Sequence, residues 1–75
     1  MDKELQDYYD NYFDLFASKG WKQFIEDMTS NKEVLSDMMT VKDADELFFR
    51  KGQLHVLNTM LKFKETIETT YEENV

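Results

Sequence analysis

Residues 56–71 read VLNTMLKFKETIETTY, and they carry the most regular apolar pattern in the chain. At 100° per residue, apolar side chains fill one side of a helix and polar side chains the other. The apolar side is formed by Val56, Leu57, Met60, Leu61, Phe63, Ile67 and Tyr71. The segment before it remains rich in apolar residues back to Val41, so we expect one long helix over residues 41–72, capped by Thr40.

Two further apolar stripes precede this helix. The first covers about residues 2–18, with Asp2 as its cap, and contains Leu5, Tyr8, Tyr9, Tyr12, Phe13 and Phe16. The second covers residues 21–38 and contains Trp21, Phe24, Ile25, Met28, Val34, Leu35 and Met38. Between them, Gly20 stands where a helix-ending residue favours the left-handed backbone.

The second stripe has a weak middle, because the side chains of residues 29–32 compete for backbone hydrogen bonds. One helix and two short helices both fit residues 21–38, and we favour one. Trp21 opens this stripe, so we expect it to be buried with Phe24 and Ile25. The predicted fold class is all-α: a single domain over residues 1–75, with a short N-terminal helix, a middle helix and a long amphipathic C-terminal helix.

The small size of the chain limits its stability. A domain of 75 residues buries only about 60% of the surface that its unfolded chain exposes, and disulfides, metals or association usually compensate. The chain has no Cys and one His, His55, so disulfides are excluded and tetrahedral zinc nearly so. Aromatic residues make up 15% of the chain. We therefore expect association, most simply a homo-oligomer.

The charge balance argues against several classes of partner. Sixteen acidic and nine basic residues give a formal charge of −7, which repels nucleic acid and anionic membranes. The acidic surface either keeps an aromatic-rich protein soluble or imitates the phosphates of DNA; we favour solubility. No apolar run approaches the roughly 20 residues of a membrane span, and the N-terminus lacks a signal-peptide pattern. A soluble intracellular protein is expected.

No residue pattern indicates catalysis, a cofactor or a metal site. His55 falls on the polar side of its helix with no carboxylate three or four residues away, and we interpret it as an exposed histidine. Acidic residues cluster at Asp7, Asp10 and Asp14 and again at 43–46, but no calcium-binding loop is present. A solvated helix face and the start of a helix account for these clusters. We predict no catalytic residues, no cofactor, no metal and no enzymatic activity.

One segment, residues 48–54, stands out as a candidate interaction site. Its apolar residues surround the helix axis instead of lining one stripe, which is typical of a helix contacted on several sides. A glycine inside a helix commonly permits a close helix crossing or a kink. The candidate interaction or helix-crossing residues are Phe48, Phe49, Arg50, Lys51, Gly52 and Leu54. The two cations are expected to pair with Asp45 or Glu46 rather than with a phosphate.

Two sequence motifs resemble those of a known group of proteins. The first is YYDNYFDLF at residues 8–16, continuing into GWKQFIEDM at 20–28; the second is FFRKGQL at residues 48–54, followed by Val56-Leu57 and closing on Tyr71-Glu72-Glu73. In this order they resemble small helical accessory proteins of tailed bacteriophages, especially short-tailed ones. The resemblance spans about residues 8–73 and supplies no catalytic residues. It implies a phage setting, and hence the host cytoplasm or the virion.

These observations favour a non-enzymatic protein–protein interaction module. The leading hypothesis is a structural or assembly accessory protein that binds other phage proteins during construction of the head, tail or packaging machinery. The alternative is a small acidic inhibitor that binds a host enzyme such as a polymerase or nuclease, by DNA mimicry. Direct nucleic-acid binding is not expected, because no helix carries a basic face.

Overall fold

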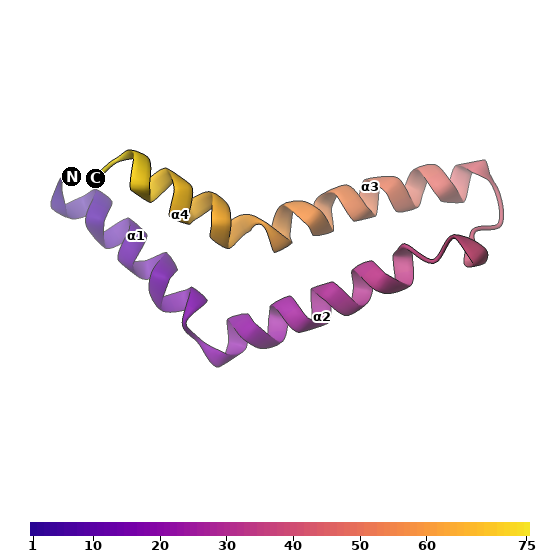
Figure 1. Ribbon diagram of the computed structural model, residues 1–75, viewed down its shortest axis with the longest axis horizontal. Helices are drawn as coiled ribbons and strands as arrows, with labels where there is room; N and C mark the ends of the chain where they lie inside the picture. The colour runs from indigo at the N-terminus through magenta and orange to yellow at the C-terminus, as the bar shows by residue number, and fades with distance from the viewer.

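The chain folds into one long, bent helical hairpin whose termini lie side by side (Figure 1). The computed structural model describes all residues 1–75 and contains no strand. Its elements are α1 (Lys3–Phe16), α2 (Lys19–Leu35), a 3-10 turn η1 (Met38–Thr40), α3 (Ala44–Leu61) and α4 (Phe63–Glu73). The all-α prediction is confirmed, whereas the predicted count of three helices is wrong because the C-terminal helix is divided.

The boundary between α1 and α2 lies at Ala17 and Ser18. Asp2 caps α1 as predicted, its carboxylate accepting the Leu5 N–H at 2.7 Å. The Ser18 hydroxyl accepts the Trp21 N–H at 3.1 Å and so caps α2. The prediction of a left-handed Gly20 is wrong, since no glycine has a positive φ and Gly20 lies in the first turn of α2. The Ser18 cap, two residues before Gly20, makes a left-handed stop unnecessary.

The second helix is continuous through its weak middle, as we predicted, but it ends at Leu35 rather than at residue 38. Residues 38–40 form the 3-10 turn, in which the Asp37 carboxylate accepts the Met39 N–H. Thr40 does not cap the next helix. The cap is Asp43, whose carboxylate accepts the Glu46 N–H at 2.8 Å, while Glu46 accepts the Lys42 N–H. This reciprocal arrangement fixes the start of α3.

The expected helix over residues 41–72 is broken at Lys62, where α3 ends and α4 begins (Figure 1). Ala17 and Ser18 interrupt the other side of the helical hairpin, between α1 and α2, so the two sides bend together. Three aromatic rings pack at this elbow: Phe16 lies 5.0 Å from Trp21 and 5.9 Å from Phe63, centroid to centroid. Trp21 is only partly buried, so the prediction that it is largely buried with Phe24 and Ile25 is too strong; Phe24 is exposed.

The elbow divides the molecule into two arms. We call α1 and α4, with residues 1–18 and 62–75, the terminal arm, and α2, η1 and α3, residues 19–61, the distal arm. The buried residues of the terminal arm and elbow are Tyr9, Phe16 and Ile67, packed against Leu5, Tyr12, Phe13, Trp21, Phe63 and Tyr71. Aromatic pairs close this packing, such as Tyr9 against Tyr71 at 5.3 Å. In the distal arm only Leu57 is buried.

The molecule is elongated rather than compact. It measures 52 × 24 × 15 Å and has a radius of gyration of 16.4 Å, whereas a compact domain of this length would have about 11 Å. Its accessible surface is 5913 Å², against about 4,900 Å² for a compact monomer of this mass. A two-helix arm has no third element to cover its apolar side chains, which is why the excess surface arises.

Candidate functional site: an apolar groove in the distal arm

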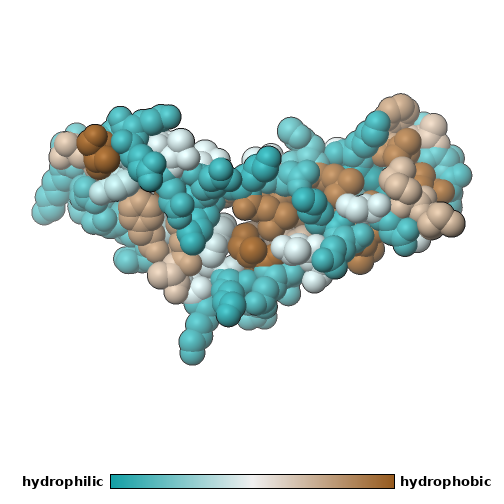
Figure 2. Space-filling view, in the orientation of Figure 1, coloured by the Kyte–Doolittle hydropathy of each residue, from teal (hydrophilic) through white to brown (hydrophobic).

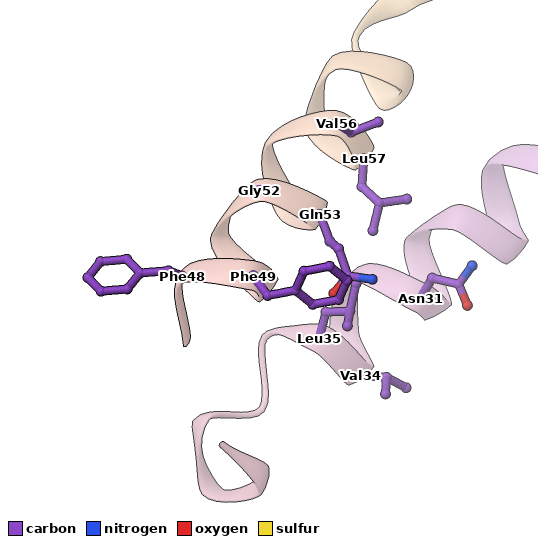
Figure 3. Close-up of a pocket in the computed structure, with 9 residues that line it drawn as sticks. All are labelled: Asn31, Val34, Leu35, Phe48, Phe49, Gly52, Gln53, Val56 and Leu57. Carbon is purple, nitrogen blue, oxygen red and sulfur yellow. The ribbon is translucent and has the colours of Figure 1, made fainter. Parts of the chain in front are cut away.

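An open groove lies between the second half of α2 and the middle of α3. Its volume is about 860 Å³, and Figure 3 shows the side chains that line it. Six of the nine lining residues are hydrophobic, and the full set is Asn31, Val34, Leu35, Phe48, Phe49, Gly52, Gln53, Val56 and Leu57. Figure 2 shows apolar atoms gathered between α2 and α3, with hydrophilic atoms on both sides.

The apolar residues of the groove are exposed to an unusual degree. Val34 is 70% exposed, Phe48 65%, Phe49 68% and Val56 56%. None of the lining residues is charged, although 33% of the chain is charged. Exposed apolar side chains are unremarkable singly, but a contiguous apolar patch with a polar surround marks an interaction site.

Gly52 lies inside α3 on the open side of the groove. A Cβ atom built on Gly52 would meet no heavy atom within 4 Å. The close helix crossing predicted here is therefore absent within the chain, and the helix bends at Lys62 instead. Phe48, Gly52 and Val56 are spaced four residues apart and form one row along α3. The glycine leaves a gap between two large exposed side chains.

The apolar surface extends beyond the groove in both directions. Towards the elbow, a smaller hollow is lined by Trp21, Phe24, Thr59, Met60 and Phe63. Because Met60 follows Val56 by four residues, the two hollows share one face of α3. At the tip of the arm, η1 exposes Met38 and Met39, the latter 92% exposed. Met side chains adapt their shape readily and are frequent at binding surfaces.

Three of the candidate residues, Phe48, Phe49 and Gly52, line the groove, and the other three do not. The Arg50 guanidinium holds the tip of the arm: Nη1 donates to Asp37 O at 3.1 Å and to the Thr40 hydroxyl at 2.6 Å. Its Nη2 pairs with Glu46 Oε1 at 3.0 Å, as the helical spacing predicted. The Lys51 ammonium lies 5.6 Å from the centre of the Phe48 ring. Leu54 is partly buried.

The α2 side of the groove was missed by sequence reasoning. Val34 and Leu35 continue the apolar stripe of their helix, so the pattern assigns both to the core. Val56 is likewise part of the regular stripe of residues 56–71, yet it is exposed while its neighbour Leu57 is buried. Periodicity identifies the apolar face of a helix. It does not indicate whether the fold supplies enough partners to cover that face.

The remaining titratable groups form no second site. No three acidic or histidine side chains converge in a way that would hold a metal ion. None of the helices combines the length and apolar character of a membrane span. His55 is exposed. Tyr8 and Tyr12 stack edge to face on α1 with centroids 5.1 Å apart. The charge of the Tyr12 phenolate, and secondarily desolvation, raises the pKa of Tyr8 above its ordinary value.

No similarity to a known protein identifies the chain or its groove. No protein-family model, no curated protein and no solved structure matches the chain.

Proposed function

We propose that the chain is a non-enzymatic protein-binding module whose binding surface is the groove between α2 and α3. The observation that supports this proposal is the exposure of Val34, Phe48, Phe49 and Val56 around a groove without a charged residue. Aromatic and aliphatic side chains of this kind form the desolvated centre of protein interfaces. A site for catalysis would instead need converging polar groups.

We further propose a role as a phage structural or assembly accessory protein, acting in the host cytoplasm or in the virion. The sequence resemblance supports the phage setting, and a groove-bearing arm suits an assembly contact. The second candidate, a DNA-mimicking inhibitor of a host enzyme, is favoured by one observation. The terminal arm, residues 1–18 and 62–75, contains nine acidic and three basic side chains, for a net charge of −6. Inhibition by mimicry would use this arm and not the groove.

Site-specific cross-linking tests the proposal, because a chain without Cys accepts a unique thiol anywhere. Val34→Cys carries a photoactivatable maleimide at the groove, and Thr66→Cys carries the same group on the polar face of α4. In phage-infected cells we expect cross-links to protein from position 34 and few from position 66. Phage structural proteins among the products support the assembly role. Cross-links from position 66 alone, to a host enzyme, would favour the inhibitor and contradict the groove.

A further inference from the structure

We propose that the occupant of the groove is a second copy of this chain, so that two distal arms pack antiparallel into a four-helix bundle. This inference depends on the proposed function, because it needs the groove to be a protein-binding surface. Each arm contributes α2 and α3, two antiparallel helices joined at the tip by residues 36–43. Two such pairs, face to face, form a four-helix bundle, which encloses a core on all sides.

The area of uncovered surface matches the need of a dimer. The chain exposes roughly 1,000 Å² more surface than a compact monomer of its mass would. A stable interface buries about 800 Å² on each partner. The uncovered apolar residues lie in the groove and in the hollow next to it, on one face of α3. One contact between two distal arms would cover these residues and bury an area of the size that a stable interface needs.

The distribution of charge indicates which arm forms the dimer contact and in which orientation the two arms pack. Residues 19–61 hold six basic and seven acidic side chains, a net charge of −1, so the distal arm carries little of the total of −7. The other −6 lies on the terminal arm. If the two distal arms packed in parallel, the two acidic terminal arms would lie beside each other and repel. An antiparallel arrangement places them at opposite ends of the dimer.

The row Phe48, Gly52, Val56 fits its own copy in the antiparallel direction. With a two-fold axis beside Gly52, Phe48 of each copy faces Val56 of the other, and the two glycines face each other. A two-fold interface requires this kind of self-complementarity. The gap at Gly52, where nothing lies within 4 Å of a built Cβ, lets the two α3 helices approach closely.

Disulfide trapping tests this register. Gly52→Cys places one thiol in each copy next to the two-fold axis, within the short Cα–Cα distance that a disulfide requires. We expect mild oxidation to convert most of this variant into a covalent dimer, while the Thr66→Cys control remains monomeric on gels. Equal dimer formation by both variants would overturn the register.

Sedimentation tests the dimer without a thiol. At about 100 μM the unmodified chain should have twice the 9.0 kDa mass of one chain. Gly52→Glu should raise the dissociation constant of the dimer about ten-fold or more, because it places two carboxylates close together at the two-fold axis. Thr66→Glu should leave the dissociation constant unchanged. Circular dichroism should show unchanged helicity in both variants. A monomeric wild-type chain that still cross-links to other proteins through position 34 would overturn the dimer and leave the proposed function standing. A monomer without such cross-links would overturn both.

Discussion

At the scale of single residues, Gly52 shows that a local sequence signal does not determine where a contact is made. A glycine inside a helix costs about 1 kcal/mol relative to alanine, so its presence suggests a compensating contact. The sequence indicates a helix crossing, and within the chain there is none. In the proposed dimer, the second copy makes that contact. The sequence predicted that Gly52 lies inside a helix. The open space beside Gly52 depends instead on where α2 ends.

Gly52→Ala should therefore have opposite effects on folding and on association. In the isolated chain the added methyl group meets nothing, so unfolding should become less favourable for the variant by about 1 kcal/mol. For a domain of this size that corresponds to a rise of roughly 4–8 °C in melting temperature at high dilution. At high concentration the same methyl group should weaken the dimer. Thermal melts over a wide concentration range measure both effects, and a uniform fall in melting temperature would contradict the open site.

The tyrosine pair on α1 gives a second prediction at this scale. The pKa of Tyr8 is raised mainly by the neighbouring Tyr12 charge, so Tyr12→Phe should lower it towards its ordinary value of about 10. Because the folded-state pKa exceeds the unfolded one, the stability contribution of Tyr8 is present below about pH 10 and is lost as pH rises through the raised pKa. NMR titration of the Tyr8 ring measures this, with Tyr71→Phe as the control. An unchanged Tyr8 titration in Tyr12→Phe would contradict the assigned cause.

At the scale of elements, the sequence predicted where helices form better than where they end. The cap at Asp2 follows from local signals that do not need the rest of the fold, whereas the weak middle of α2 was compatible with one helix or with two short ones. The break at Lys62 has no such signal, since the residues around it contain neither Gly nor Pro. The break occurs because α4 packs along α1, which buries Ile67 against Tyr9 and Phe16. That packing is a property of two distant segments and is invisible in either alone.

The elbow should be the most sensitive contact between elements. Trp21 links α2 to both sides of the bend, 5.0 Å from Phe16 and 6.4 Å from Phe63. Because it is only partly buried, Trp21→Ala should cost about 3 kcal/mol, the lower end for a large aromatic residue. Phe24→Ala, one turn further along α2 and exposed, should cost less. Urea unfolding followed by circular dichroism compares them, and equal losses would show that the elbow packing is not special.

At the scale of the whole molecule, the two arms differ in what they can do alone. The terminal arm buries an aromatic core, whereas the distal arm buries one residue and exposes the side chains that its pattern assigns to a core. Composition alone predicted this surplus, because a small chain rich in aromatic residues lacks the volume to hide them. The location of the surplus required the structure. Only the pairing of α2 with α3 shows that the uncovered face is one surface, distant from most of the negative charge.

Salt dependence follows from that separation of charge and apolar surface. The Debye length falls from about 10 Å at 0.1 M salt to about 3 Å at 1 M. In the antiparallel dimer, the acidic terminal arms are separated by roughly 27 Å, the length of an 18-residue helix such as α3. This distance exceeds the Debye length at both salt concentrations, so added salt has little repulsion left to screen. We expect the dissociation constant to change less than about three-fold over this range of sodium chloride. In a parallel dimer, two arms of charge −6 would lie side by side, and added salt would tighten association more than about ten-fold. Sedimentation equilibrium at both salt concentrations therefore distinguishes the two orientations by the size of one change in affinity.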